Sequence, residues 1–309
     1  MPSEITVFAP ATVANLSCGY DIFALAIDKP GDEIHLKKRR DSKIQITKIT
    51  GDKGKLPSKL MKNTVGIAVV SFLKHINSSQ GVDIEIHKKM PIGSGLGSSA
   101  ASAVAGAFAI NELLDRPMKK RELLPFALEA EMTLTGMCAD NVSASLLGGF
   151  ILVRSYEPLD IVELPVPKEL FCALVYPHVE VLTKMARALL PNKIALQKVV
   201  QQSGNVAGLV AGLHQENYDL ISRSLQDVIV EPERSKLIPG FQDIKSASLN
   251  AGALGCGISG SGPSVFSFTN SKDLAEKVGL AKVKVLDGLK VNCNLFISKV
   301  NMDGVVVLD

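Results

Sequence analysis

The chain has 309 residues with a formal net charge of +3, and 46% of them are hydrophobic, which is enough for two domains that each bury a core. Scattered charges, few aromatic residues and no tryptophan speak against a nucleic-acid-binding surface. No apolar run approaches the ~18 residues that a membrane span needs. The five cysteines form no C-x-x-C pair and the N-terminus lacks a signal pattern, so we expect a reduced, cytoplasmic protein without zinc or disulfides.

Hydrophobic periodicity predicts alternating strands and helices in the first half of the chain. The predicted strands are residues 5–9, 32–38, 43–49, 82–87 and 150–154, and the predicted helices are 62–76, 100–114 and 123–134. The helix that starts at residue 100 is apolar nearly all round. We therefore expect that helix to be buried between two layers of the fold.

Three prolines, Pro158, Pro165 and Pro167, mark the expected junction between two domains. We divide the chain there into an N-terminal domain, residues 1–160, and a C-terminal domain, residues 161–309. The mixture of strands and helices on both sides of this junction indicates the α+β class.

The second half begins with a strand predicted over residues 171–176 and continues through several helices to a strand that closes at residues 267–270. Residues 295–300 and 305–308 are two further predicted strands, separated by Asp303-Gly304. An Asp-Gly pair is typical of a tight turn, so the sequence predicts that these last two strands form a hairpin.

Residues 91–102, Pro-Ile-Gly-Ser-Gly-Leu-Gly-Ser-Ser-Ala-Ala-Ser, carry the strongest functional signal, and we call residues 91–99 the glycine loop. Three alternate glycines leave backbone N–H groups free to surround an anion, and a helix N-terminus follows; both features favour a phosphate group. The loop lacks the lysine of a Walker motif and the spacing of a dinucleotide fingerprint. A glycine-rich turn ahead of a buried helix is the alternative interpretation.

The pattern Pro-x-x-x-Gly-Leu-Gly-Ser-Ser-Ala, residues 91–100, resembles the ATP-binding motif of the GHMP kinases, the superfamily of galactose, homoserine, mevalonate and phosphomevalonate kinases. Residues 9–21 resemble the first motif of that superfamily in its homoserine kinase form, and residues 252–266 resemble the third. The resemblance implies a two-domain GHMP kinase fold, with an N-terminal ribosomal-protein-S5-domain-2-like domain and a C-terminal ferredoxin-like α/β sandwich. The active site is then expected between the two domains.

The resemblance also implies ATP and Mg²⁺ as cofactors, with magnesium held by a serine hydroxyl and a carboxylate. Ser99 matches the serine position, and Glu131 is our choice for the acid. Glu129 stays open as the alternative, because the spacing from this helix to Asp140 is one residue shorter than is usual. The residues expected to bind ATP are Asn63, Pro91, Ile92, Gly93, Ser94, Gly95, Leu96, Gly97, Ser98 and Ser99. A helix N-cap is the alternative role for Asn63.

Two segments of the second half resemble homoserine kinases in particular, and they contain Arg187 and Arg234. The resemblance assigns these arginines to the carboxylate of the acceptor, and Asn15, Asp21 and Asn141 suit its ammonium group. The implied reaction is ATP-dependent phosphorylation of the L-homoserine hydroxyl to O-phospho-L-homoserine, a step of threonine biosynthesis. The alternatives are a GHMP kinase for another hydroxylated metabolite, such as mevalonate or shikimate, and a non-catalytic metabolite sensor.

Asp140, Asn141 and Thr183 are the residues expected at the reaction itself. Some superfamily members use an aspartate as base, which Asp140 would supply; in homoserine kinases the aligned position is often considered to be the Asn, and the proton then passes to the γ-phosphate. Thr183 is expected to align the hydroxyl or the phosphate. Cys138 stands where family members commonly carry a histidine. Homodimers are common in the family, so the resemblance allows a homodimer.

Overall fold

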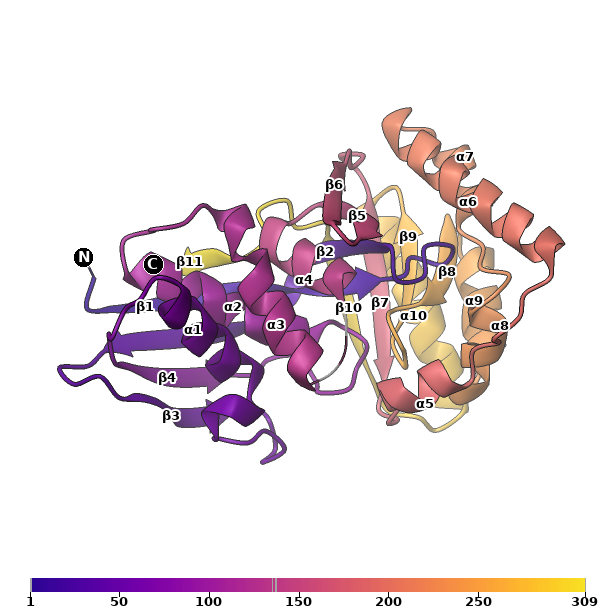
Figure 1. Ribbon diagram of the computed structural model, residues 1–309. Coiled ribbons are helices and arrows are strands. Elements are labelled where there is room, and N and C mark those ends of the chain that lie inside the picture. The colour runs from indigo at the N-terminus through magenta and orange to yellow at the C-terminus, as the bar shows by residue number, and fades with distance from the viewer. Residues whose placement is uncertain (1, 135, 137, 309) are drawn as a thin grey trace.

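Two β-sheets carry the fold in the computed structural model, which describes residues 2–134, 136 and 138–308 (Figure 1). Within these residues, the first sheet has seven strands in the order β11-β1-β2-β4-β3, with β5 paired to β2 and β6 to β5, and the second has four in the order β10-β7-β9-β8. The strands are β1 (Glu4–Ala14), β2 (Phe23–Lys38), β3 (Ile44–Thr50), β4 (Val82–His87), β5 (Phe150–Tyr156), β6 (Leu159–Leu164), β7 (Phe171–Pro177), β8 (Gly255–Ile258), β9 (Val265–Thr269), β10 (Cys293–Lys299) and β11 (Val306–Leu308).

Helices α1 to α4 lie over one face of the first sheet, and α9 and α10 pack against the second (Figure 1). The α-helices are α1 (Thr64–His75), α2 (Ser98–Leu113), α3 (Leu124–Leu134), α4 (Ala139–Leu147), α5 (Thr183–Ala188), α6 (Leu196–His214), α7 (Tyr218–Ser224), α8 (Glu231–Arg234), α9 (Phe241–Asn250) and α10 (Lys272–Gly288). Short 3-10 helices are η1 (Leu60–Lys62), η2 (Lys120–Leu123) and η3 (Ser235–Leu237). Among the described residues, no helix has both the length and the apolar character that a membrane crossing requires.

Strand β4 shows the alternation that predicted it. Val82, Ile84 and Ile86 are buried against the helices, whereas the residues between them are partly exposed. Strand β2 is longer than predicted, because residues 23–27 form a continuous buried run without the alternation that marks residues 32–38.

Helix α2 lies between the first sheet and the outer helices α1 and α3. All but one of its side chains are buried, which confirms the prediction of a helix enclosed between layers. Gly106 allows α1 to approach closely, since a Cβ at this position would lie 2.9 Å from the carbonyl oxygen of Val65. The close packing of α1 against α2 holds the helix whose first residues end the glycine loop.

Strand β7 lies inside the second sheet with both faces covered. Cys172 and Leu174 contribute to the large core that extends from the first sheet. Ala173 and Val175 face the other way, toward apolar side chains of α9 and α10. The two sheets therefore share one continuous apolar core.

The prediction of a C-terminal hairpin is wrong, because β11 does not pair with β10. Strand β10 pairs with β7 in the second sheet, whereas β11 pairs with β1 in the first and places Val306 opposite Phe8. Between them the chain passes from one sheet to the other, and the backbone N–H of Asn301 donates to the Ala26 carbonyl at 2.9 Å. An Asp-Gly pair indicates a change in chain direction, but it does not indicate which strand the following segment will pair with.

Strand β6 occupies the predicted domain junction. It pairs with β5, and Pro158 and Pro165 flank it, so the division after residue 160 falls inside a strand of the first sheet. We propose that the N-terminal unit runs through β6 and includes β11, and that the C-terminal unit runs from β7 through β10.

Candidate active site

A cleft with a cavity volume of about 370 Å³ receives residues from both halves of the chain. The predicted site residues that line it are Asn15, Asp21, Asn63, Ile92, Gly93, Ser94, Gly95, Gly97, Ser98, Ser99, Glu131, Asp140, Asn141, Thr183, Arg187 and Arg234. Leu96 is instead fully buried within the glycine loop. Pro91 is not among the lining residues, but its carbonyl accepts a hydrogen bond from the Ser94 hydroxyl at 2.7 Å within the glycine loop.

The glycine loop has the backbone conformation of an anion-binding nest. Gly93, Gly95 and Gly97 all take left-handed conformations, with φ of 71°, 77° and 66°. Left-handed residues that alternate with ordinary ones direct successive N–H groups toward a common concave side. At Gly95 a side chain is also excluded by space, because a Cβ would lie 2.4 Å from the carbonyl oxygen of Ser259.

Distant segments hold this loop by its carbonyl groups. The Leu96 carbonyl accepts a hydrogen bond from the backbone N–H of Thr12 at 3.0 Å. The Gly95 carbonyl accepts one from the Ser259 hydroxyl at 2.7 Å. The first and third motifs therefore meet at the second, as their resemblance to one family's motifs predicts.

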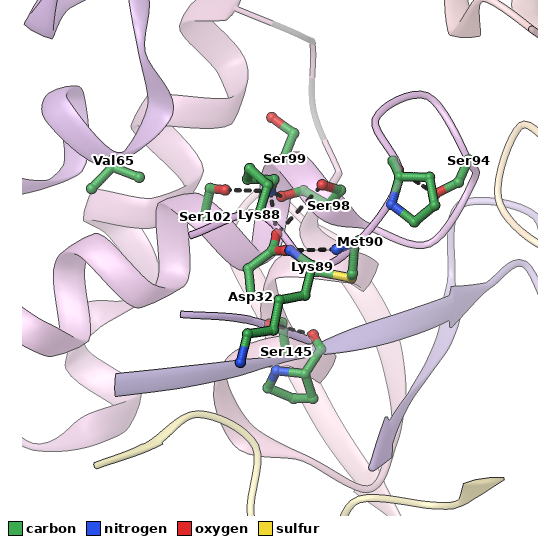
Figure 2. A network of polar contacts seen from close by, with 12 residues as sticks. Asp32, Val65, Lys88, Lys89, Met90, Ser94, Ser98, Ser99, Ser102 and Ser145 are labelled. Carbon is green, nitrogen blue, oxygen red and sulfur yellow. Dashed lines mark hydrogen bonds and ion pairs between the residues drawn. The ribbon is translucent and has the colours of Figure 1, made fainter. Parts of the chain in front are cut away.

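A buried lysine lies beneath the start of α2 (Figure 2). The Lys88 ammonium forms an ion pair with Asp32 and donates to the Ser98 carbonyl at 2.9 Å and the Ser102 hydroxyl at 2.8 Å. Burial lowers the pKa of Lys88, although the charge of Asp32 opposes this shift. Lys88 also lines the cleft, so the pair belongs to the wall of the site.

The two candidate magnesium acids occupy different places. Glu131 is 2% exposed and accepts a hydrogen bond from the Ser99 hydroxyl at 2.5 Å, in the wall of the cleft. Glu129 is exposed and accepts a hydrogen bond from Ser71. The structure therefore brings Ser99 together with Glu131 and leaves Glu129 outside the cleft wall.

This donor set fits magnesium. Mg²⁺ prefers hard oxygen ligands and takes one or two carboxylates from the protein, with phosphates and water completing its octahedron. Ser99 and Glu131 supply a hydroxyl and a carboxylate beside the loop. In the part of the chain that the structure describes, no group of three or more His, Cys, Asp or Glu side chains is placed to hold a metal by itself. Bound phosphates would complete the coordination.

Two opposite charges face each other in the wall of the cleft. Arg187 Nη2 lies 3.7 Å from Asp21 Oδ2, and both side chains are partly exposed. The Asn15 amide lies beside this pair, since it donates to the Gly260 carbonyl at 2.7 Å and accepts the backbone N–H of Asp21 at 3.0 Å. A cation and an anion are thus presented to the same space.

Arg234 is more deeply placed than Arg187, at 3% exposed. Its guanidinium donates to the Gly260 carbonyl at 2.9 Å and to the Ala186 carbonyl at 3.3 Å, and it lies over the Tyr20 ring at 4.9 Å. Burial lowers the pKa of this guanidinium. Arg234 therefore connects α5, the third motif and the first motif, and it also reaches the cleft.

Asn141 is held on two sides at the start of α4. Its side-chain oxygen accepts the Thr12 hydroxyl at 2.6 Å, and its amide nitrogen donates to Asp140 at 3.2 Å. Asp140 is 2% exposed, and burial raises the pKa of its carboxyl to about 7. Thr183 and Ser261 also line the cleft, and their hydroxyls lie 3.3 Å apart.

Asn63 performs the capping role that the sequence left open. Its side chain accepts the backbone N–H of Val65 at 3.1 Å and donates to the Pro57 carbonyl at 3.0 Å. The cap lies in the cleft wall at the entrance to α1.

Comparisons with known proteins agree with this geometry. The family models described as GHMP kinases N terminal domain and GHMP kinases C terminal match residues 63–149 and 206–281. A homoserine kinase of Chlorobium phaeobacteroides is 46% identical over 314 residues, covering 97% of this chain and 98% of that protein. The homoserine kinase of Arabidopsis thaliana is 41% identical over 283 residues, covering 89% of this chain and 76% of that protein. The chain belongs to the homoserine kinase family of the GHMP kinases.

Two solved structures share the fold of this chain. The crystal structure of homoserine kinase from Cytophaga hutchinsonii is 54% identical, covers 100% of this chain and 98% of its own, and has a TM-score of 0.98. An L. major mevalonate kinase in complex with R-mevalonate has a TM-score of 0.73 at 16% identity, over 97% of this chain and 98% of its own. That second likeness concerns the fold alone. The predicted α+β, two-domain GHMP kinase fold is confirmed.

Cys138 is the position where this homoserine kinase family member departs from the expected histidine. Burial raises the pKa of the thiol to about 12, and the negative charges of Asp140 and Glu131 add to the shift. The side chain is therefore a neutral thiol in the cleft wall at ordinary pH.

Sequence reasoning missed Asp32 and Lys88. A signal for them exists in the strand alternation, because Asp32 continues the inward positions of Ile34 and Leu36 in β2, and Lys88 continues those of Ile84 and Ile86 in β4. Two opposite charges at core-facing positions of neighbouring strands predict a buried ion pair, since a buried charge requires a partner.

Proposed function

We propose that this chain transfers the γ-phosphoryl group of ATP to the hydroxyl of L-homoserine, giving O-phospho-L-homoserine and ADP. One observation carries the proposal beyond family membership: the glycine loop lines the same cleft as Arg187 and Asp21, whose opposite charges face each other. An amino acid acceptor carries a carboxylate and an ammonium group, and these two side chains offer the complementary charges.

The nucleotide end of the cleft is proposed to bind Mg-ATP. The N–H groups of Gly93 to Ser99 would hold the phosphates, with Pro91 and Leu96 shaping the loop and Asn63 bordering the nucleoside. Ser99 and Glu131 would hold Mg²⁺. When bound there, this ion neutralises negative charge on the β- and γ-phosphates.

The acceptor end is proposed to bind L-homoserine by its charged groups. Arg187 would hold the carboxylate, assisted by Arg234, whose guanidinium already donates to two carbonyl groups. Asp21 and Asn15 would hold the ammonium group. Binding at both ends brings the acceptor hydroxyl toward the γ-phosphate, and such positioning supplies much of the rate in phosphoryl transfer.

We propose that Asn141 orients the acceptor hydroxyl and that Asp140 positions Asn141. The Asn141 amide is fixed between Thr12 and Asp140, so its N–H group has a defined direction. Thr183 would help to align the hydroxyl or the phosphate. The hydroxyl proton then passes to the transferring phosphoryl group, and no side chain is required as a strong base.

The same proposal includes the cellular setting. Membership of the homoserine kinase family supports a step in threonine biosynthesis and a homodimer, which is common in that family. All five cysteines are free thiols, and free thiols are typical of a reducing compartment such as the cytoplasm.

The deciding experiment measures ADP release from Mg-ATP by the purified chain with L-homoserine, mevalonate, shikimate, galactose or no acceptor. We expect turnover with L-homoserine alone. Turnover with another acceptor would overturn the substrate assignment while keeping a kinase. Silence with every acceptor, in a protein that still binds ATP, would favour a metabolite sensor.

A further inference from the structure

The carboxylate of Asp32 joins three parts of the nucleotide end. Asp32 Oδ1 accepts the backbone N–H groups of Lys89 at 2.7 Å and Met90 at 2.9 Å, the two residues immediately before the glycine loop. Its other oxygen pairs with the Lys88 ammonium, and the Ser98 hydroxyl reaches it at 3.5 Å. Figure 2 shows these contacts converging on Asp32 from the residues that precede the glycine loop and from the start of α2.

The position of Asp32 follows from the strand register. Ile34 of β2 lies opposite Ile86 of β4, and Glu33 lies opposite His87. One further step along the two strands places Asp32 opposite Lys88, where the ladder ends and the chain turns into the glycine loop. The carboxylate therefore accepts hydrogen bonds from the backbone N–H groups of Lys89 and Met90, which lie beyond the end of the β2–β4 ladder.

The pair is fully buried and its hydrogen bonds are well satisfied. The Asp32 side chain is 0% exposed, and the three acceptors of the Lys88 ammonium come from β2 and from the first turns of α2. Taking two charges out of water costs several kcal/mol per ion, which apolar side chains of similar size would avoid. Such a pair at the entrance of a phosphate-binding loop indicates a functional constraint.

We propose that Asp32 is a positioning residue for nucleotide binding. Through the Lys89 and Met90 amides it fixes where the glycine loop begins, and through Lys88 it fixes the first turns of α2, where the loop ends. The loop is thus clamped at both ends by one carboxylate. The inference rests on the proposed function in that the glycine loop is taken to bind the phosphates of ATP.

A matched control lies next to this pair. Glu33 and Lys89 form a second ion pair between the same two segments, but their side chains point to solvent, at 24% and 55% exposure. Glu33→Gln therefore removes one negative charge beside Asp32 without touching the buried network.

The test compares Asp32→Asn with Glu33→Gln. The amide introduced by Asp32→Asn keeps an oxygen for the two backbone N–H groups and loses the charge that holds Lys88. We measure the dissociation constant of a non-hydrolysable ATP analogue in the presence of Mg²⁺. We expect it to rise about ten-fold or more in Asp32→Asn, because small displacements of a positioned group are costly. It should stay within about two-fold of the parent in Glu33→Gln, and L-homoserine affinity, measured by calorimetry, should be unchanged in both.

A purely structural role would lower the thermal midpoint of Asp32→Asn and leave analogue affinity unchanged in the folded protein, which overturns the proposal. Where Asp32→Asn does not fold, Asp32→Glu carries the test, since it keeps a charged partner for Lys88 and moves the carboxylate by one methylene. We expect that variant to bind the analogue about ten-fold more weakly, because both ends of the loop are displaced; parent-like binding contradicts the inference. Failure of the unmodified chain to bind the analogue would instead contradict the ATP site itself.

Discussion

Asp140 is a buried carboxyl beside Asn141, at 2% exposure. Burial raises its pKa from 3.8 to about 7, while the hydrogen bonds from Asn141 oppose the shift. Between these two values the folded state keeps the proton that the unfolded state has lost. Stability therefore falls as the pH rises from about 4 to about 7.

Asp140→Asn should remove this pH dependence. We expect the loss of unfolding free energy between pH 5 and pH 8 to be smaller by about 2 kcal/mol in the variant, measured by denaturant titration at both pH values. An unchanged slope of stability against pH would mean that Asp140 titrates normally.

The same variant tests the route of the proton. The amide introduced by Asp140→Asn retains an oxygen for the Asn141 side chain, so kcat should stay within about ten-fold of the parent. A general base contributes a factor of about 10²–10⁴. A loss of that size, together with loss of a kcat dependence on pH near 7, would identify Asp140 as the base.

Glu131 and Glu129 form a matched pair on α3. Glu131→Gln removes the charge beside Ser99, and we expect the Mg²⁺ concentration for half-maximal activity to rise by about ten-fold or more. Glu129→Gln lies outside the cleft wall and should change it less than two-fold. The reverse order, obtained in Mg²⁺ titrations at fixed ATP, would assign the metal to Glu129.

Alanine variants of the two arginines should differ in stability, although both remove a cation from the acceptor site. Arg187→Ala removes a partly exposed cation, so we expect the KM for L-homoserine to rise by roughly 100-fold with little change in the thermal midpoint. Arg234→Ala also leaves the Gly260 and Ala186 carbonyls without a donor and should lower the thermal midpoint as well. Steady-state kinetics and thermal melts of both variants check this difference. A rise of less than five-fold in the KM for L-homoserine in Arg187→Ala would contradict the proposal that Arg187 binds the carboxylate.

At the scale of elements, the glycine loop is shaped by contact with the third motif. Gly93 and Gly95 have nearly the same φ, but a Cβ at Gly93 meets open space, whereas one at Gly95 meets backbone atoms of Ser259 and Gly262. Gly93→Ala should cost about 1 kcal/mol of unfolding free energy, from left-handed strain alone. Gly95→Ala should cost about 3 kcal/mol, because the third motif must also move.

Denaturant unfolding of the two alanine variants measures this difference. Equal losses would show that the loop and the third motif separate easily, and that the close approach at Gly95 contributes little to stability.

Local patterns predicted the elements whose neighbours are also local. The alternation of β4 and the all-round apolar character of α2 follow from burial on one face and on every face, so both predictions hold. The first half of β2 was missed because burial on both faces removes the alternation. The pairing of β11 with β1 was missed because the partner lies almost 300 residues away in the sequence.

At the scale of the whole molecule, the two halves share apolar contacts and a backbone bridge. Leu209 and Leu213 of α6 belong to the same apolar cluster as the core of the first sheet, and Ile27 of β2 forms a bridge with Val300. We expect one unfolding transition, with equal calorimetric and van't Hoff enthalpies in scanning calorimetry. Two resolved transitions would show that the halves unfold independently.

The linear sequence was enough to predict the family and the three motifs, and sixteen of the eighteen site residues predicted from it line the cleft. These are predictable because a phosphate-binding loop requires glycines and hydroxyls at close spacing, and such spacing survives in the linear order of residues. The linear sequence could not tell which acid meets Ser99, which arginine is buried, or that Asp32 meets Lys88 beneath the glycine loop. Those choices depend on helix rotation, sheet register and burial, which arise when segments far apart in the chain pack together.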